Sequence, residues 1–150
     1  MRSRSAARVL TLLSLLVLVA LGGLLVPEIR TTERRLRERA LEADVKALNQ
    51  ALRRYGDEHQ GALPGFDDGV LDQDLLRRQL TLPSAPDGTI APNGPCGPYL
   101  RTGVPPNPWN GSSELKVVTT VTVPPPDGTT GWIVHVPTRR VLSNSLASER

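Results

Sequence analysis

Two histidines and one cysteine are the side chains of this chain best suited to bind a metal or to act as a base or nucleophile. His59, His135 and Cys96 lie far apart in the sequence, and no neighbouring carboxylates complete the ligand spacing of a zinc site. Cys96 sits among prolines and glycines, without a nearby Lys or His that would activate its sulfur. We therefore expect solvent-facing or partly packed histidines and a structural thiol.

Carboxylates are the second group that could do chemistry. Asp67, Asp68, Asp72 and Asp74 are close enough in sequence to gather around a hard cation. They also surround the start of a predicted helix, where aspartates cap free N–H groups and interact favourably with the helix dipole. Capping is the simpler interpretation, so the sequence predicts no metal site here.

The remaining motifs favour a protein without enzymatic activity. Trp109 and Trp132 could form a ligand platform, but in a chain with 3% aromatic residues they are more useful in the core. Asn110-Gly111-Ser112 matches the N-glycosylation pattern, which would have no meaning if the chain is bacterial. There is no phosphate-binding loop, nucleophile elbow or pair of carboxylates on one element. The sequence therefore predicts no catalytic residue, cofactor, metal or small-molecule substrate.

The charge pattern argues against a nucleic-acid partner. The chain has 18 Lys and Arg against 15 Asp and Glu, a net charge of +3, and the surplus lies in the N-terminal arm and the helix that follows the apolar run. There the arginines alternate with acids such as Glu33, Glu38, Glu42 and Asp44, and no aromatic residues lie between them. This pattern predicts a solvated helix face.

An uncharged run from Val9 to Val26 decides much of the interpretation of the chain. As a helix it would be about 27 Å long, close to the roughly 30 Å hydrocarbon core of a bilayer. A cleaved signal peptide is the competing interpretation, because basic residues precede the run and small residues lie near its end. We favour a retained transmembrane helix over residues 9–26, since the run is longer than the apolar part of most signals.

The short N-terminal arm indicates how this helix would be oriented. Residues 1–8 carry Arg2, Arg4 and Arg8, although the arginines beyond the run are more numerous. The arm is short, and this favours a single-pass topology with residues 1–8 on the inner side of the membrane and the C-terminal domain outside.

Residues 27–56 show the periodicity of an amphipathic helix that serves as stalk and spine. Its large apolar stripe recurs at steps of three and four, and its alanines widen the stripe: Leu41, Val45, Leu48, Leu52 and Tyr55, with Ala40, Ala43, Ala47 and Ala51. Residues 28–39 contain few large apolar side chains, which predicts a polar stalk or packing against other copies. Pro27 either starts this helix or kinks one continuous helix.

Residues 57–150 predict a small head that is rich in loops, because twelve of the fourteen prolines lie beyond residue 80. A short helix is expected over 70–80, with Asp68 or Asp72 as its cap. Alternating residues predict strands near 115–123, 132–136 and 141–145 in a three-stranded antiparallel meander. The expected fold class is α+β, with Trp132, Val134 and Val136 on the sheet packed against the long helix.

Two C-terminal segments carry a resemblance to a known family. GPYLRTGVPPNPWNG at 97–111 and GWIVHVPTRRVLSNS at 131–145 resemble the C-terminal part of G-type pseudopilins of the type II secretion system. The order of a membrane helix, an amphipathic helix and a small C-terminal sheet is similar to that of type IV pilins. The resemblance implies a pilin-like fold with the sheet packed on the long helix.

The N-terminus is a degenerate version of the family's motif. Prepilins carry a Gly before their cleavage site and then commonly Phe-Thr-Leu-Ile-Glu, whereas Val9 and Ser14 stand at the Gly and Glu positions here. In the family this Glu is thought to pair with the amino terminus of a neighbouring subunit. The G-type family also binds calcium through an Asp-rich loop, and the matching segment offers Asp127 alone, so no calcium is expected.

Two hypotheses about function follow. The first is a structural, pseudopilin-like subunit of a type II secretion or type IV pilus-like assembly, which acts by helix packing in and above the inner membrane. It would be a single-pass protein of a bacterial inner membrane, with residues 1–8 in the cytoplasm and the C-terminal domain in the periplasm. Its partners would be other pseudopilin subunits, inner-membrane platform proteins of the secretion system and membrane lipid. The alternative is a membrane-tethered or secreted small binding module that has a pilin-like fold and does not assemble into a filament.

Overall fold

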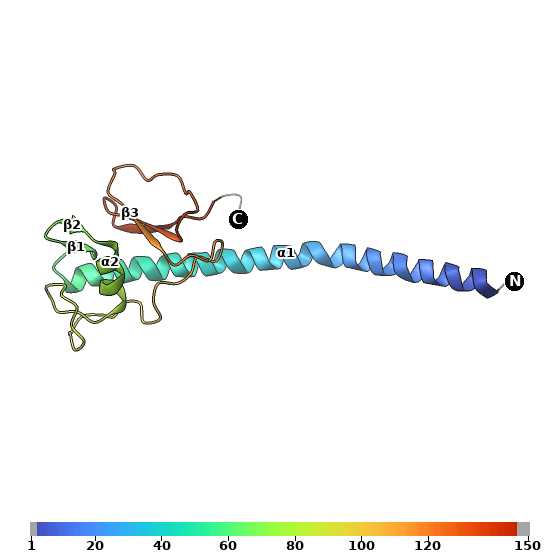
Figure 1. Ribbon diagram of the computed structural model, residues 1–150, viewed down its shortest axis with the longest axis horizontal. Coiled ribbons are helices and arrows are strands. Elements are labelled where there is room, and N and C mark those ends of the chain that lie inside the picture. The colour runs from blue at the N-terminus through green and yellow to red at the C-terminus, as the bar shows by residue number, and fades with distance from the viewer. Residues whose placement is uncertain (1–2, 147–150) are drawn as a thin grey trace. The chain divides into compact units, whose positions relative to one another are not determined.

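A computed structural model describes the backbone of residues 3–146 and, within that range, the side chains of residues 13–14 and 31–146. The chain forms two compact units, Met1–Arg37 and Glu38–Arg150. The helix α1 (Ser3–Glu58) begins in the first unit and ends in the second (Figure 1). Its backbone is helical on both sides of Pro27, and no second helix starts there.

The predicted transmembrane helix is corrected by the structure. Among the residues that the structure describes, no helix is both long enough and apolar enough to cross a membrane. The described part of α1 from Thr31 onward is dense in Arg and Glu, and most side chains of the run 9–26 lie outside the described residues. The finding contradicts the span at 9–26 and the single-pass placement in a bacterial inner membrane, with its cytoplasmic arm and periplasmic domain.

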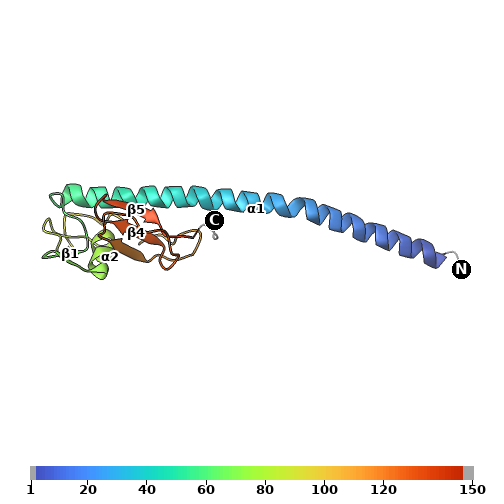
Figure 2. The ribbon, with the colours of Figure 1, turned by 90° about the horizontal axis from the view of Figure 1, so that it is seen from above.

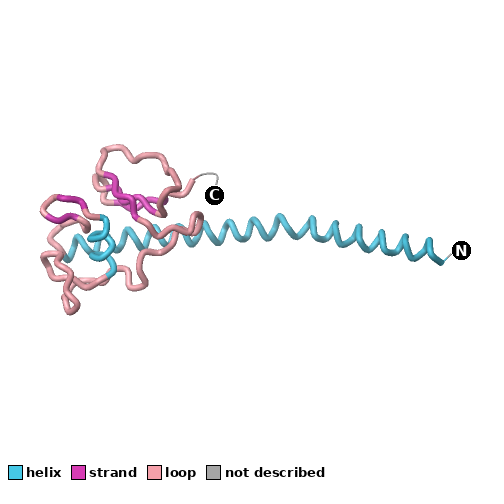
Figure 3. Tube along the Cα trace, in the orientation of Figure 1, coloured by secondary structure: helices cyan, strands magenta, loops and turns pink. Residues whose placement is uncertain are grey.

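The second unit combines the end of α1 with a short helix and two small sheets, which makes it α+β as expected. Its elements are short and are separated by long loops (Figure 3). After α1 they are β1 (Phe66–Asp67), β2 (Val70–Leu71), α2 (Gln73–Thr81), β3 (Leu115–Val118), β4 (Trp132–His135) and β5 (Arg140–Ser143).

The three-stranded sheet has the expected strand order, but its first pair runs in an unexpected direction. Its order is β3-β4-β5, with β3 parallel to β4 and β4 antiparallel to β5. The predicted antiparallel meander is therefore wrong for β3. The strand ends at Val118 instead of 123, and the long connection 119–131 lets the chain return to the starting end of the sheet, as a parallel neighbour requires.

A tight hairpin replaces the first turn of the predicted helix 70–80. β1 and β2 pair antiparallel around Asp68 and Gly69, which have φ of 46° and 80°. Positive φ at both central residues is typical of a two-residue hairpin turn. Asp72 then accepts hydrogen bonds from the N–H groups of Asp74 and Leu75 at 2.8 and 3.1 Å, so it caps α2 as predicted.

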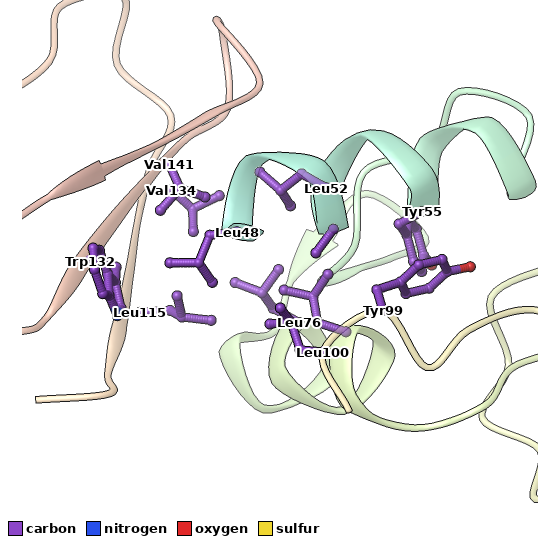
Figure 4. Packing of buried hydrophobic residues seen from close by; sticks show 12 residues of the cluster. Leu48, Leu52, Tyr55, Leu76, Tyr99, Leu100, Leu115, Trp132, Val134 and Val141 are labelled. Atoms are coloured by element: carbon purple, nitrogen blue, oxygen red, sulfur yellow. The ribbon is translucent and has the colours of Figure 1, made fainter. Parts of the chain in front are cut away.

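The core lies between the end of α1, α2 and the sheet (Figures 2 and 4). The predicted stripe on α1 is confirmed, since its residues are buried in this cluster or packed against it: Leu41, Val45, Leu48, Leu52 and Tyr55. Only Ala51 of the four alanines is buried, and the other three are exposed. Trp132 and Val134 lie in the same cluster, and each buried side chain stabilises the fold by roughly 1.5–3 kcal/mol before entropy. Val136 was expected there too, but it follows the end of β4 and is only partly buried.

Asn49 joins α1 to the edge of the sheet. Its side-chain amide donates to the carbonyl oxygen of Val141 at 3.0 Å and accepts from the N–H of Val141 at 3.0 Å. It also donates to the carbonyl oxygen of Val45 on its own helix at 2.8 Å. The amide thus satisfies both backbone groups of Val141 on β5, much as a neighbouring strand would.

Candidate functional site

A buried polar cluster surrounds His59, just after the end of α1. His59 is 3% exposed, and its Nδ1 lies 3.0 Å from the carbonyl oxygen of Pro86. Its Nε2 lies 3.2 Å from the hydroxyl oxygens of both Ser84 and Tyr99. A carbonyl oxygen only accepts, so Nδ1 donates to Pro86. The single hydroxyl proton of Tyr99 is directed at Glu58, which leaves the Ser84 hydroxyl as the donor to Nε2.

Glu58 completes this cluster. The Tyr99 hydroxyl donates to its carboxylate at 2.7 Å, and the N–H of Gly97 donates to the same oxygen at 3.1 Å. The Tyr99 hydrogen bond is the main cause that lowers the pKa of Glu58, and Arg54 adds a favourable charge. Burial, followed by the bond to Glu58, raises the pKa of Tyr99.

The pairing of Ser84 with His59 has the composition of a nucleophile and a base, but its position does not suit catalysis. Ser84 is fully buried, and its backbone pairs with Cys96 in both directions, at 2.9 and 3.1 Å. A substrate could not reach its hydroxyl without displacing this pairing. The cluster therefore fastens the loop that contains Ser84 and Cys96 to the end of α1.

His135 is also buried, so the expectation of solvent-facing or partly packed histidines is wrong for both. Its Nε2 donates to the carbonyl oxygen of Thr120 at 2.9 Å, and its Nδ1 lies 2.7 Å from the hydroxyl of Thr138. This ring fixes the start of the connection 119–131.

Cys96 is buried and has no disulfide partner in the part of the chain that the structure describes, as expected of a structural thiol.

Asp127 lies at the centre of a second polar cluster, at the other end of the same connection. Its carboxylate pairs with the ammonium group of Lys116 and accepts hydrogen bonds from Thr129 at 2.7 Å and from the Asn144 amide at 2.7 Å. The bond from Lys116 is the largest cause that lowers the pKa of Asp127. These partners surround the carboxylate of the segment where the resemblance would place a calcium loop.

The other aspartates that could have gathered around a cation do not converge. Asp72 caps α2, and Asp67 and Asp68 are exposed on the β1–β2 hairpin. Within the described residues, no group of three or more His, Cys, Asp or Glu side chains is placed to hold a metal ion.

Two open clefts are present in the second unit. One of ≈ 320 Å³ lies at the end of α1, where Arg53, Asp57 and Arg139 contribute the charged groups. The other, of ≈ 290 Å³, is lined by Asp67, Arg78 and neighbouring residues. Neither cleft is lined by His or Cys, and the carboxylates that line them are Asp57 in the first and Asp67 and Asp87 in the second.

The tryptophans divide between two environments. Trp132 is fully buried, and its indole N–H donates to the carbonyl oxygen of Pro105 at 2.8 Å. Trp109 is only partly buried. The core interpretation is therefore confirmed for Trp132, and Trp109 lies at the border of the unit.

A long accessible surface lies on α1 itself. Every residue from 31 to 40 is exposed, and Leu36 is 59% exposed. Within the second unit, helical spacing places Ala40, Ala43 and Ala47 on one face, which we call the alanine face, and all three are exposed. This face is turned away from the buried stripe, and its small side chains would let another helix approach closely.

The sequence analysis missed the residues that fasten the head together. The sequence gives one indication of the role of Asn49, because its polar amide stands beside the apolar stripe, where a buried side chain is expected. Nothing in the sequence identifies Val141 as its partner. The His59 cluster joins residues from three separate segments, so local spacing could not reveal it.

No family model, curated protein or solved structure matches this chain.

Proposed function

We propose that this chain is a structural, pseudopilin-like subunit of an assembly of the type II secretion or type IV pilus kind. It would act by packing its long helix against other subunits, and the head would hold the helix and form an outer surface. The partners would be further copies or related subunits of the same assembly. In this proposal the protein is not an enzyme.

The observation that carries the proposal is the accessibility of the described part of α1. The head covers one stripe of this helix, whereas residues 31–40 are exposed all round and the alanine face extends the accessible surface to Ala47. An isolated helix gains little from propensity alone, and most helices are stabilised by packing an apolar face. A second helix on the alanine face would provide that packing.

The segments behind the resemblance add independent support, since they contact each other in the head. Asn107, in the first segment, donates to the carbonyl oxygen of Gly131 at 2.7 Å and to the Ser143 hydroxyl at 3.0 Å, both in the second segment. Asn107 is fully buried. The shared residues therefore form one structural unit, as a family resemblance in fold would require.

Site-specific crosslinking in the cells that make the protein tests the proposal. In a Cys96→Ala background, Ala43→Cys places a thiol on the alanine face, and Val70→Cys places one on the head, where Val70 is 69% exposed. A short bis-maleimide should link Ala43→Cys chains into covalent dimers or link them to another protein. The Val70→Cys control should give several-fold less product. Equal or absent crosslinking at the two positions would refute the proposal and favour the non-assembling binding module.

A further inference from the structure

The cleft at the end of α1 contains two arginines from separate segments. Arg53 lies near the end of the helix, Arg139 lies in the turn between β4 and β5, and both line the same space of ≈ 320 Å³. Asp57 lines it as well, and all three residues are exposed. Over the described residues, none of these three side chains makes a hydrogen bond or an ion pair. The cleft therefore offers two cationic groups and one carboxylate to a ligand.

The end of α1 forms an apolar wall beside these charges. The N–H of Gly61 donates to the carbonyl oxygen of Gly56 at 2.7 Å, a bond that closes the helix and turns the chain back. Ala62 and Leu63 follow this turn and line the cleft together with Leu52 of the helix. A ligand in the cleft therefore meets apolar surface next to the arginines.

Gly56 stands in the last turn of α1, where the fold does not require a glycine. Its φ is not positive, and a Cβ at this position would lie 3.5 Å from the carbonyl oxygen of Ala62, an ordinary contact distance. Alanine would also favour the helix more than glycine does. The glycine thus leaves this part of the wall free of a side chain and open to a ligand.

Arg139 adopts a backbone conformation that its residue type does not favour. Its φ of 52° lies in the left-handed region, which glycine or asparagine enters more easily. Strained residues of this kind are concentrated at ligand-binding and active sites. Two positions on the cleft, Gly56 and Arg139, therefore hold residues that local stability disfavours, and such exceptions are expected at functional sites.

The chemistry of the lining indicates which ligand fits. Guanidinium groups bind carboxylates and phosphates, but Asp57 would repel the higher charge of a phosphate. The Asp57 carboxylate can accept a hydrogen bond, which a peptide N–H supplies. Leu52 and Leu63 favour an apolar side chain beside these polar groups. The last residue of a peptide chain combines a free carboxylate, an N–H group and a side chain in one small unit.

We propose that this cleft binds the C-terminal carboxylate of a partner protein whose last residue is apolar. Arg53 and Arg139 hold the carboxylate, and the N–H of the partner's last residue donates to Asp57. The apolar side chain of that residue contacts Leu52 and Leu63. This site goes beyond the proposed function, because it does not involve the alanine face.

Fluorescence anisotropy of labelled peptides with the full chain tests the assignment. The probe is the pentapeptide Gly-Ser-Gly-Ala-Leu, with rhodamine on its amino end and a free C-terminal carboxylate. The same peptide with a C-terminal amide should bind about tenfold more weakly, because it loses hydrogen bonds between charged groups. Arg53→Gln and Arg139→Gly should each weaken binding of the carboxylate probe by about tenfold. The matched Arg77→Gln, at an exposed arginine on α2, should bind the probe as the wild type does.

Several results would overturn the proposal: no binding of the probe, equal affinity for the carboxylate and the amide, or wild-type affinity in Arg53→Gln or Arg139→Gly. Equal affinity for Gly-Ser-Gly-Glu-Leu amide would assign the cleft to an acidic side chain instead. Self-association of the chain that Arg53→Gln abolishes would assign it to a second copy. Urea unfolding of each variant confirms that it is folded, and none of these outcomes bears on helix packing, so failure leaves the proposed function untouched.

Discussion

Replacing Asn49 with alanine tests the contact between α1 and the sheet. The substitution removes two hydrogen bonds to Val141 and leaves that residue's backbone groups without their partner. Each bond contributes about 0.5–1.5 kcal/mol net, so the loss is about 1–3 kcal/mol. Alanine restores at most about 0.7 kcal/mol through helix propensity. The expected result is a free energy of unfolding lower by about 0.3–3 kcal/mol.

Urea unfolding of the full chain, followed by the fluorescence of buried Trp132, measures this loss. Gln50→Ala is the matched control, because the neighbouring Gln50 is exposed on the same helix and its replacement changes propensity alone. Asn49→Asp should also destabilise the protein, since a carboxylate accepts from the Val141 N–H but cannot donate to its carbonyl oxygen. If Asn49→Ala is as stable as Gln50→Ala, the contact does not stabilise the head and the reasoning is refuted.

Three further predictions follow from the head. Leu48→Ala should lower the free energy of unfolding by about 2–5 kcal/mol in urea titrations, because Leu48 is 1% exposed in the core. If the loss were smaller than that of Leu36→Ala, at an exposed position, Leu48 would not belong to the core. The pKa of Glu58 is lowered in the folded protein. The stability that this carboxylate contributes is therefore fully present above its pKa in the unfolded chain, and it is lost as the pH falls through its pKa in the folded protein. Glu58→Gln should therefore reduce stability at neutral pH and weaken the acid dependence of unfolding, whereas an unchanged pH profile would show that the Tyr99 bond has no such effect. Arg139 has φ of 52° in the turn before β5, and Arg139→Gly should raise the midpoint of thermal unfolding, since glycine adopts this conformation without strain; a lower midpoint would show that the arginine side chain contributes more than the strain costs.

Local periodicity predicted the helices well because it depends on neighbouring residues. The stripe from Leu41 to Tyr55 repeats at helical spacing, and Asp72 has the position and chemistry of a cap. The alternation after Leu115 indicated a strand but not its direction, because side-chain alternation is the same in parallel and antiparallel sheets. The sequence predicted that Ala40, Ala43 and Ala47 widen the buried stripe, but all three are exposed. Alanine fits both a core and a surface, so its position in the pattern does not decide between them.

The polar contacts that fasten the head were beyond sequence reasoning for a different physical reason. Glu58, His59, Ser84 and Tyr99 come together only after the loop between α2 and β3 has folded back on α1. Asp127 likewise meets Lys116 and Asn144 through the sheet. Spacing along the chain carries no information about such contacts, so the histidines were expected at the surface.

A cysteine scan of residues 31–47, one position at a time in the Cys96→Ala background, tests the central claim most directly. In-cell crosslinking with a short bis-maleimide should rise and fall with the helical period and be strongest at Ala40, Ala43 and Ala47. A uniform yield along the helix, or none at any position, would contradict the claim that this face of α1 packs against another subunit.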